Sequence, residues 1–180
     1  MLVKYSRTIT VTNINKRRIL MNEELEIKFK ISNGQFESMH SKFDFSEVKK
    51  STDTYYIMPD PNLYLRVRES KGGASFEYHE YVDEYLTKEW ESGVTSPEII
   101  KEILDKLHYQ IDVVVEKKRQ IAGYKNLEIV LDEITGLGQY LELEGKDRAI
   151  IDEVAIELGL KKENQIIGAG YPDLLRANKK

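Results

Sequence analysis

Charged residues occupy alternate positions in several short apolar segments of this chain. Glu24, Glu26 and Lys28 alternate with apolar residues in the first of these segments. In a β-strand, residues i, i+2 and i+4 share a face, so these three charges would point the same way. The pattern recurs in Arg66 with Arg68, Glu89 with Glu91, Lys117 with Arg119, Glu128 with Asp132, and Glu142 with Glu144. Carboxylates suit a hard divalent cation and basic groups suit phosphate oxygens, so both sets together suit a metal–polyphosphate complex.

The elements that would carry these residues are mostly strands. Gly72-Gly73 and Gly136-Leu137-Gly138 separate alternating runs and predict hairpin turns. Eight strands in mostly consecutive pairs favour a closed antiparallel barrel, because closure removes exposed edges. The predicted strands are 24–31, 53–58, 63–69, 74–82, 86–92, 110–121, 126–134 and 139–144.

Helices interrupt this series of strands. Ser96 can cap a helix that has Pro97 at its first position. In this helix, residues 97–108, one face gathers apolar side chains that we expect to pack against the sheet: Ile99, Ile100, Ile103, Leu104 and Leu107. A second helix is predicted at about 147–158. Residues 34–44 have weaker helical spacing, and 172–178 could form a short last helix.

The apolar helix faces decide where the strand charges point. A polar strand face is usually solvated, but here the apolar strand faces are the only large surface against which the helices can pack. We therefore predict an α+β fold, an eight-stranded antiparallel barrel with helices outside and a charged lumen. Buried charges without partners are costly, so such a lumen must hold water, metal ions or an ionic ligand.

Composition limits the partners and the compartment. The net charge of −4 gives no overall basic field for nucleic acid or an anionic membrane. No apolar run is long enough to span a membrane, and residues 1–20 lack the apolar core of a signal peptide. The absence of cysteine excludes disulfides and thiolate metal sites and suits the cytoplasm. We expect one domain over residues 21–180, after an extension of unknown role that could add an edge strand at 8–12.

The motifs and their order resemble the CYTH superfamily, the triphosphate tunnel metalloenzymes. The resemblance begins at Glu23 and covers most of the chain. It rests on Glu24-x-Glu26-x-Lys28, Asp53-Thr54-Tyr55-Tyr56, Leu65-Arg66-Val67-Arg68, Glu89-x-Glu91, Lys117-Lys118-Arg119, Leu131-Asp132-Glu133-Ile134 and Leu141-Glu142-Leu143-Glu144. It implies a tunnel that binds a triphosphate through basic residues and one or two Mg²⁺ or Mn²⁺ ions through carboxylates.

The resemblance implies metal-dependent hydrolysis of inorganic triphosphate or of a nucleoside triphosphate such as ATP. The expected substrate-binding residues are Lys28, Arg66, Arg68, His79, Lys117 and Arg119. The expected metal ligands are Glu24, Glu26, Asp132, Glu142 and Glu144, and the expected catalytic residues are Glu24, Glu26, Lys28 and Glu144. Roles for Glu89, Glu91 and Lys88 stay open.

Several alternatives remain at this stage. A class IV adenylyl cyclase, a thiamine triphosphatase and a non-catalytic polyphosphate- or nucleotide-binding module are all compatible with parts of the pattern. His79 stands where many members carry a lysine, and it could contact phosphate or serve only as a hydrogen-bonding barrel residue. An opening at a barrel edge or the N-terminal segment could also pair two chains in a homodimer.

Overall fold

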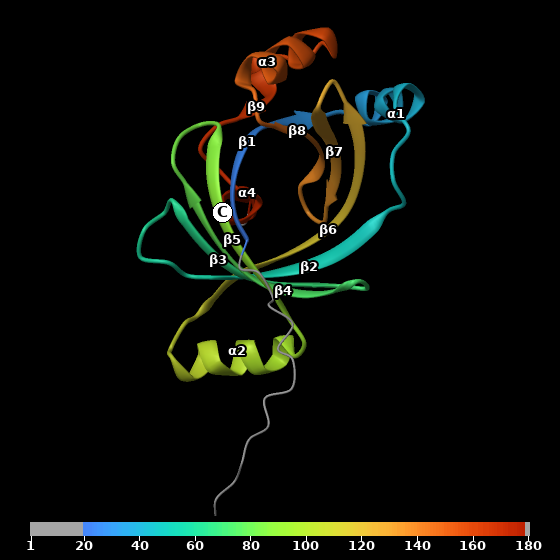
Figure 1. Ribbon diagram of the computed structural model, residues 1–180. Helices are drawn as coiled ribbons and strands as arrows, with labels where there is room; N and C mark the ends of the chain where they lie inside the picture. Colours follow the sequence, from blue (N-terminus) through green and yellow to red (C-terminus); the bar gives the residue numbers. More distant parts are fainter. Residues whose placement is uncertain (1–19, 179–180) are drawn as a thin grey trace, which may run out of the picture.

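Eight strands close into an antiparallel barrel (Figure 1). The computed structural model describes residues 20–178. The strands are β1 (Leu20–Ile31), β2 (Lys49–Tyr56), β3 (Leu63–Ser70), β4 (Gly73–Tyr81), β5 (Leu86–Val94), β6 (Ile111–Tyr124), β7 (Leu127–Ile134) and β8 (Gly138–Gly145). Their order is β5-β4-β3-β2-β6-β7-β8-β1, and antiparallel pairing of β1 with β5 closes the ring. The predicted α+β barrel is confirmed.

The strand boundaries differ from the predicted ones where pairing overrides local pattern. β2 begins at Lys49 because its first residues pair with the basic segment of β6, Lys49 opposite Arg119. A two-residue strand, β9 (Gln165–Ile166), pairs with β1 outside the ring and was not predicted. The glycine-rich turns were predicted correctly, and Gly136 and Gly138 have φ of 82° and 99°, which side chains rarely adopt.

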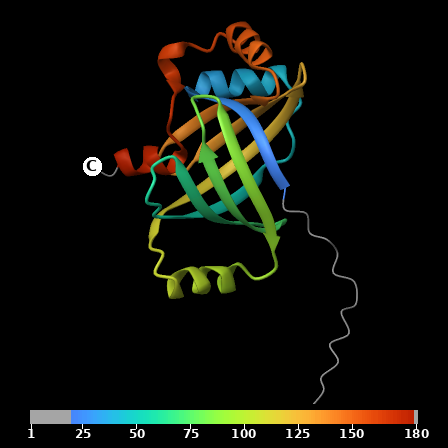
Figure 2. The ribbon, with the colours of Figure 1, turned by 60° about the vertical axis from the view of Figure 1, so that its left-hand side comes forward.

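Within the described residues, four α-helices lie outside the barrel: α1 (Asn33–Lys42), α2 (Pro97–Lys106), α3 (Arg148–Glu157) and α4 (Tyr171–Asn178). A short 3₁₀ helix, η1 (Lys162–Asn164), precedes β9. The Ser32 side chain forms a capping box with Gln35 at the start of α1. Figure 2 shows α1 and α3 together at one end of the molecule and α2 at the other. Among residues 20–178, no helix combines the length and the apolar character needed to cross a membrane.

The main core lies between the barrel wall and the helices at the α1 and α3 end. Leu141 and Leu143 of β8 are fully buried there against Ile151 and Val154 of α3. Fully burying such a side chain stabilises the fold by about 1.5–3 kcal/mol. Because apolar and charged residues alternate along β1 and β8, the same strands direct their charges into the lumen. The predicted direction of the charged strand faces is therefore confirmed.

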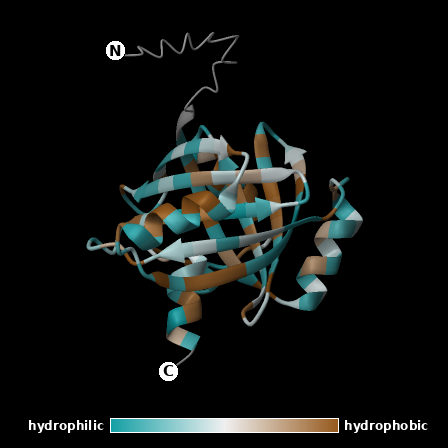
Figure 3. Ribbon diagram, turned by 90° about the horizontal axis from the view of Figure 1, so that it is seen from below, coloured by the Kyte–Doolittle hydropathy of each residue, from teal (hydrophilic) through white to brown (hydrophobic). Residues whose placement is uncertain are grey.

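Helix α2 departs from the prediction. Ile100 and Leu104 pack against Leu65 and Val67 on the outer face of β3, but Ile99, Ile103 and Leu107 are 56%, 48% and 62% exposed. The expectation that all five would pack against the sheet was wrong. At 3.6 residues per turn these positions cover about 140° of the helix circumference, and the barrel wall reaches only part of that arc. Figure 3 views the barrel from the side that α2 covers.

The predicted N-terminal extension, residues 1–20, lies outside the described residues except for Leu20, which belongs to β1. The strand considered at residues 8–12 lies outside them as well.

Candidate active site

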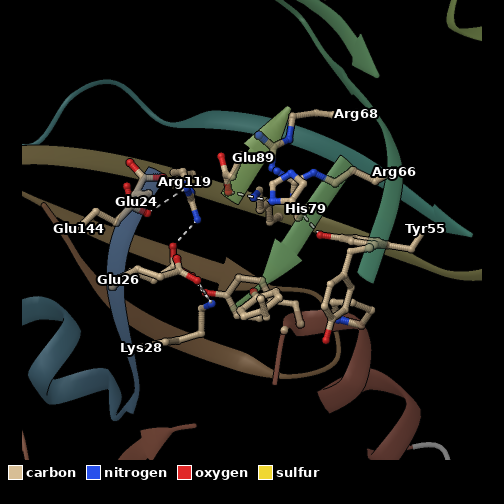
Figure 4. Close-up of a pocket in the computed structure, with 17 residues that line it drawn as sticks. Glu24, Glu26, Lys28, Tyr55, Arg66, Arg68, His79, Glu89, Arg119 and Glu144 are labelled. Carbon is tan, nitrogen blue, oxygen red and sulfur yellow. Dashed lines mark hydrogen bonds and ion pairs between the residues drawn. The ribbon is translucent and has the colours of Figure 1, made fainter. Parts of the chain in front are cut away.

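A cavity of about 100 Å³ inside the barrel is lined mostly by charged side chains, which come from six strands (Figure 4). Most of the predicted site residues meet in it. Those lining the cavity are Glu24, Glu26, Lys28, Arg66, Arg68, His79, Glu89, Lys117, Arg119, Glu142 and Glu144. Three others, Asp132, Glu91 and Lys88, do not line it.

Carboxylates from β1 and β8 form an acidic wall. The antiparallel register places Glu26 opposite Glu144 and Lys28 opposite Glu142. Carboxylate oxygens of Glu26, Glu142 and Glu144 all lie within 4.8 Å of one another. Three converging carboxylates are the ligands that Mg²⁺ and Mn²⁺ prefer, so this group fits a divalent cation.

The protonation equilibria of this wall reflect crowding in a buried site. Burial raises the pKa of Glu26 and Glu144 above the usual carboxyl range, and the other carboxylates of the wall raise both further. Burial would do the same to Glu142, but Lys28 and Arg119 hold the pKa of Glu142 well below its usual range. Burial, Glu89 and Glu26 raise the pKa of Glu24 to about 7. A divalent cation would relieve the repulsion that raises these values.

A cationic wall faces the cavity from β3 and β6, with a layer of carboxylates behind it. Arg68 donates from Nε and Nη2 to the two oxygens of Asp53, each at 3.0 Å, and Lys117 Nζ lies 3.5 Å from the same group. Arg66 Nε donates to Glu77 at 2.6 Å. Asp53 and Glu77 are only 1% and 3% exposed. Paired carboxylates thus fix the basic groups in orientation before any ligand arrives.

Burial and the neighbouring cations shift the pKa values of Asp53 and Lys117. Burial would raise the pKa of Asp53, but Lys117, Arg66 and Arg68 together lower it. Burial, Arg119 and Arg68 also lower the pKa of Lys117, to about 8. Sequence reasoning gave no role to Asp53 or Glu77. Strand register could have indicated them. Once neighbouring strands are paired, Asp53 lies opposite Arg68 and Glu77 lies opposite Arg66.

Arg119 links the acidic wall to the buried carboxylate of Asp132 on β7. Its Nε and Nη2 donate to Asp132 at 2.9 and 2.6 Å, and Nη2 also contacts Glu142. The Tyr171 hydroxyl donates to the same Asp132 carboxylate at 3.0 Å. Asp132 is 0% exposed. Asp132 lies behind the cavity wall and holds Arg119 and Tyr171 in place.

His79 lies between two carboxylates on the third side of the cavity. Its Nε2 is 3.1 Å from Glu77 and its Nδ1 is 2.8 Å from Glu89. Glu89 also reaches the cavity (Figure 4). Glu91 shares the interior face by register with Glu77, but it is exposed beyond the lining residues. Lys88 is paired in register with Glu23 and Glu80 and does not reach the cavity.

Tyrosines close the cavity at the end where α4 contacts the barrel. Tyr64 makes edge contacts with Tyr55 and Tyr81, at ring-centroid distances of 6.3 and 5.0 Å. Tyr171 is the first residue of α4, and its ring centroid lies 4.7 Å from Lys28 Nζ. The sequence predicted these tyrosines only as strand formers, because nothing local indicates which of eleven reaches the lumen.

The family model of the CYTH domain matches residues 22–169, which include nearly all of the barrel. The chain belongs to the CYTH domain family. The family resemblance predicted from the sequence motifs is therefore confirmed.

Relatives in this family have different names. "Inorganic pyrophosphatase TTM1" of Arabidopsis thaliana is 28% identical over 132 residues, which are 66% of this chain and 20% of that protein. This chain therefore spans about a fifth of that relative. "Putative adenylate cyclase MJ0240" of Methanocaldococcus jannaschii is 28% identical over 171 residues, 84% of this chain and 97% of that protein. Among solved structures, the PH1012 protein of Pyrococcus horikoshii has a TM-score of 0.76 and 28% identity, covering 84% of this chain and 98% of its own.

Proposed function

We propose that this CYTH domain hydrolyses a triphosphate in a reaction that depends on a divalent metal ion. The observation that carries the proposal is the opposition of two walls in one cavity. Three carboxylates that could hold a cation lie across the lumen from basic side chains already fixed by buried carboxylates. A site for a cation alone would not require the basic wall, and a site for an anion alone would not require the acidic wall. A metal–triphosphate complex requires both.

Glu26, Glu142 and Glu144 would hold the metal, with Glu24 beside them. When bound, Mg²⁺ or Mn²⁺ would neutralise phosphate charge and help to lower the pKa of the attacking water. Arg66, Arg68, Lys117 and Arg119 would bind phosphate oxygens, and Lys28 would reach them from the opposite wall.

Most of the catalytic effect would come from positioning and charge stabilisation, as is usual in phosphoryl transfer. Asp53 and Glu77 hold Arg66 and Arg68 in advance, so little reorganisation would accompany the reaction. Glu24 lies beside the metal-binding carboxylates, and in the metal-free cavity burial, Glu89 and Glu26 raise its pKa to about 7. We assign to its carboxylate the proton that leaves the attacking water.

Adenylyl cyclase activity is the second candidate, since the relative that this chain covers to 97% carries that name. A cyclase must seat a purine and a ribose beside the phosphates and exclude water. The tyrosines that close the cavity pack against one another, and Tyr64 donates its hydroxyl to Asp173. This end is a packed aromatic wall, which favours hydrolysis of inorganic triphosphate over cyclisation of ATP.

One assay separates these possibilities. The purified chain is incubated with Mg²⁺ or Mn²⁺ and, separately, with inorganic triphosphate, ATP or thiamine triphosphate, and orthophosphate, pyrophosphate and cyclic AMP are measured. Release of orthophosphate from inorganic triphosphate, lost on chelation of the metal, is expected. Cyclic AMP as the main product from ATP would replace the hydrolase with a cyclase. Binding of triphosphate with no turnover of any substrate would indicate a non-catalytic module.

A further inference from the structure

Helix α2 carries an exposed apolar stripe, defined by Ile99, Ile103 and Leu107. The three side chains are 56%, 48% and 62% exposed. Successive members are four residues apart, so they line one side of the helix. Single exposed apolar residues are normal on a protein surface, but a continuous row of large ones marks a contact surface.

More exposed apolar residues follow the helix in the sequence. Tyr109 and Ile111, in the segment that leads into β6, are 38% and 58% exposed. The Ile57 backbone N–H donates to the Gln110 carbonyl at 2.9 Å, which brings Ile57, itself 51% exposed, beside this segment. Exposed apolar residues are therefore found beyond α2 as well as on it.

A row of charged residues borders the stripe on the side that faces solvent. Glu98, Glu102 and Lys106 each precede a stripe residue by one position and are all exposed. They are also four residues apart and form a row beside the stripe. The row is acidic at the N-terminal end of α2 and basic at the C-terminal end. Such a row is complementary to a copy of itself running in the opposite direction.

We propose that α2 packs antiparallel against α2 of a second copy of this chain, stripe against stripe. A two-fold axis near Ile103 places Glu98 opposite the partner's Lys106 and Lys106 opposite the partner's Glu98. The central residue Glu102 meets the partner's Glu102, and these two carboxylates lie at the solvent-facing border. One patch thus serves both subunits, which is what a two-fold interface requires.

The size of the surface sets the expected strength. Helix α2 has ten residues and is about 15 Å long, so the area that it can bury is small. A standard interface buries about 800 Å² on each partner. The stripe alone is too small for that, so Tyr109, Ile111 and Ile57 must join the contact. We expect a reversible dimer whose population rises with protein concentration. The surface lies outside the lumen, so this inference is independent of the proposed activity.

Sedimentation velocity of the full chain over a wide micromolar range tests the interface. The wild-type chain is expected to shift from monomer to dimer as the concentration rises. Ile103→Glu should remain a monomer throughout, because it places a charge in the centre of the apolar contact. Ile156→Glu makes the same change at a side chain of α3 that is 78% exposed, and it should dimerise like the wild type.

Charge exchange tests the antiparallel arrangement specifically. In the Glu98→Lys dimer, the new lysine of each chain faces Lys106 of the other chain. These two repulsive contacts should weaken association by about fivefold. The double variant Glu98→Lys/Lys106→Glu rebuilds both pairs with reversed sign and should recover wild-type affinity. Failure of the double variant to recover affinity would overturn the antiparallel arrangement.

Two results would overturn the dimer itself. One is a wild-type chain that stays monomeric at the highest concentration. The other is a melting temperature that, at concentrations where the wild type is a monomer, is lower for Ile103→Glu than for the wild type but unchanged for Ile156→Glu, which would show that the stripe is covered by another part of the same chain, such as residues 1–19.

Discussion

The crowding of carboxylates on β1 and β8 is the residue-level feature that most constrains the chemistry. Glu26, Glu142 and Glu144 lie close enough for one ion to contact all three. Holding three like charges in a buried site opposes folding unless cations or protons compensate. Lys28 and Arg119 compensate Glu142 directly, and the raised pKa values of Glu26 and Glu144 show that compensation there is incomplete. A divalent cation would supply the charge that the protein itself does not.

Glu144→Gln tests this arrangement. Metal-dependent turnover of triphosphate should fall by about 100-fold or more, because a neutral amide replaces an anionic carboxylate ligand. The melting temperature should not fall, since the raised pKa of Glu144 means that its charged form opposes folding at neutral pH. Mn²⁺ titration calorimetry and thermal unfolding measure the two effects. Glu116→Gln, an exposed change on β6, is the matched control, and unaltered Mn²⁺ affinity in Glu144→Gln would remove this residue from the metal site.

Lys117 gives the triphosphate affinity a pH dependence. Its pKa of about 8 means that the ammonium loses its proton as the pH rises through that value in the free protein. The KM for inorganic triphosphate should therefore rise above about pH 8, relative to Lys117→Arg, whose guanidinium stays charged. Steady-state kinetics at constant ionic strength measure the difference. Parallel pH profiles for the two proteins would contradict the assignment.

The sequence predicted the residues that line the cavity better than those that hold them. Alternation identifies which charges share a face, so Arg66, Arg68 and Glu26 were placed correctly in the lumen. Asp53 and Glu77 escaped because a buried carboxylate that pairs with a lining arginine looks, in sequence, like any other strand carboxylate. Their significance depends on strand register, which alternation leaves open.

At the scale of elements, the strands were predictable and the orientation of the helices was less so. The presence of each barrel strand follows from alternation and glycine turns, both of which are local, whereas the start of β2 at Lys49 depends on pairing with β6. The face of α2 that contacts the barrel depends on how far β3 and β4 extend beneath it, and the sequence does not report this. β9 was missed because two residues carry no periodicity. Tyr171 is another case, since its position in the lumen depends on where α4 meets the barrel wall.

Asp173 is expected to fix α4 to the barrel. Its carboxylate accepts hydrogen bonds from the Gly170 backbone N–H at 2.7 Å and from the hydroxyl of Tyr64 on β3. Asp173→Ala removes both and should lower the free energy of unfolding by about 1–3 kcal/mol. Asp105→Ala on α2, an exposed position, should change it by less than about 0.5 kcal/mol. Urea denaturation measures both, and equal values would show that α4 is held by its apolar contacts alone.

In the whole molecule, stability and chemistry reside on opposite faces of the same strands. The outer face of β1 and β8 forms the apolar core with α3, and the inner face carries the acidic wall. An ordinary barrel packs its interior and solvates its exterior. Here the exterior core frees the lumen to hold charges that pair with one another and that a polar ligand would compensate further. The family membership and the site geometry agree with this division.

This division predicts that adjacent residues of β8 can be damaged independently. Leu143 is 0% exposed, so Leu143→Ala should lower the free energy of unfolding by about 2–5 kcal/mol through lost burial and a cavity. Because Leu143 faces away from the lumen, the remaining folded protein should keep the kcat/KM of the wild type when assayed well below its melting temperature. Ile156→Ala, at a side chain that is 78% exposed, is the stability control. A stable Leu143→Ala protein that has lost turnover would show instead that the outer core determines the geometry of the acidic wall.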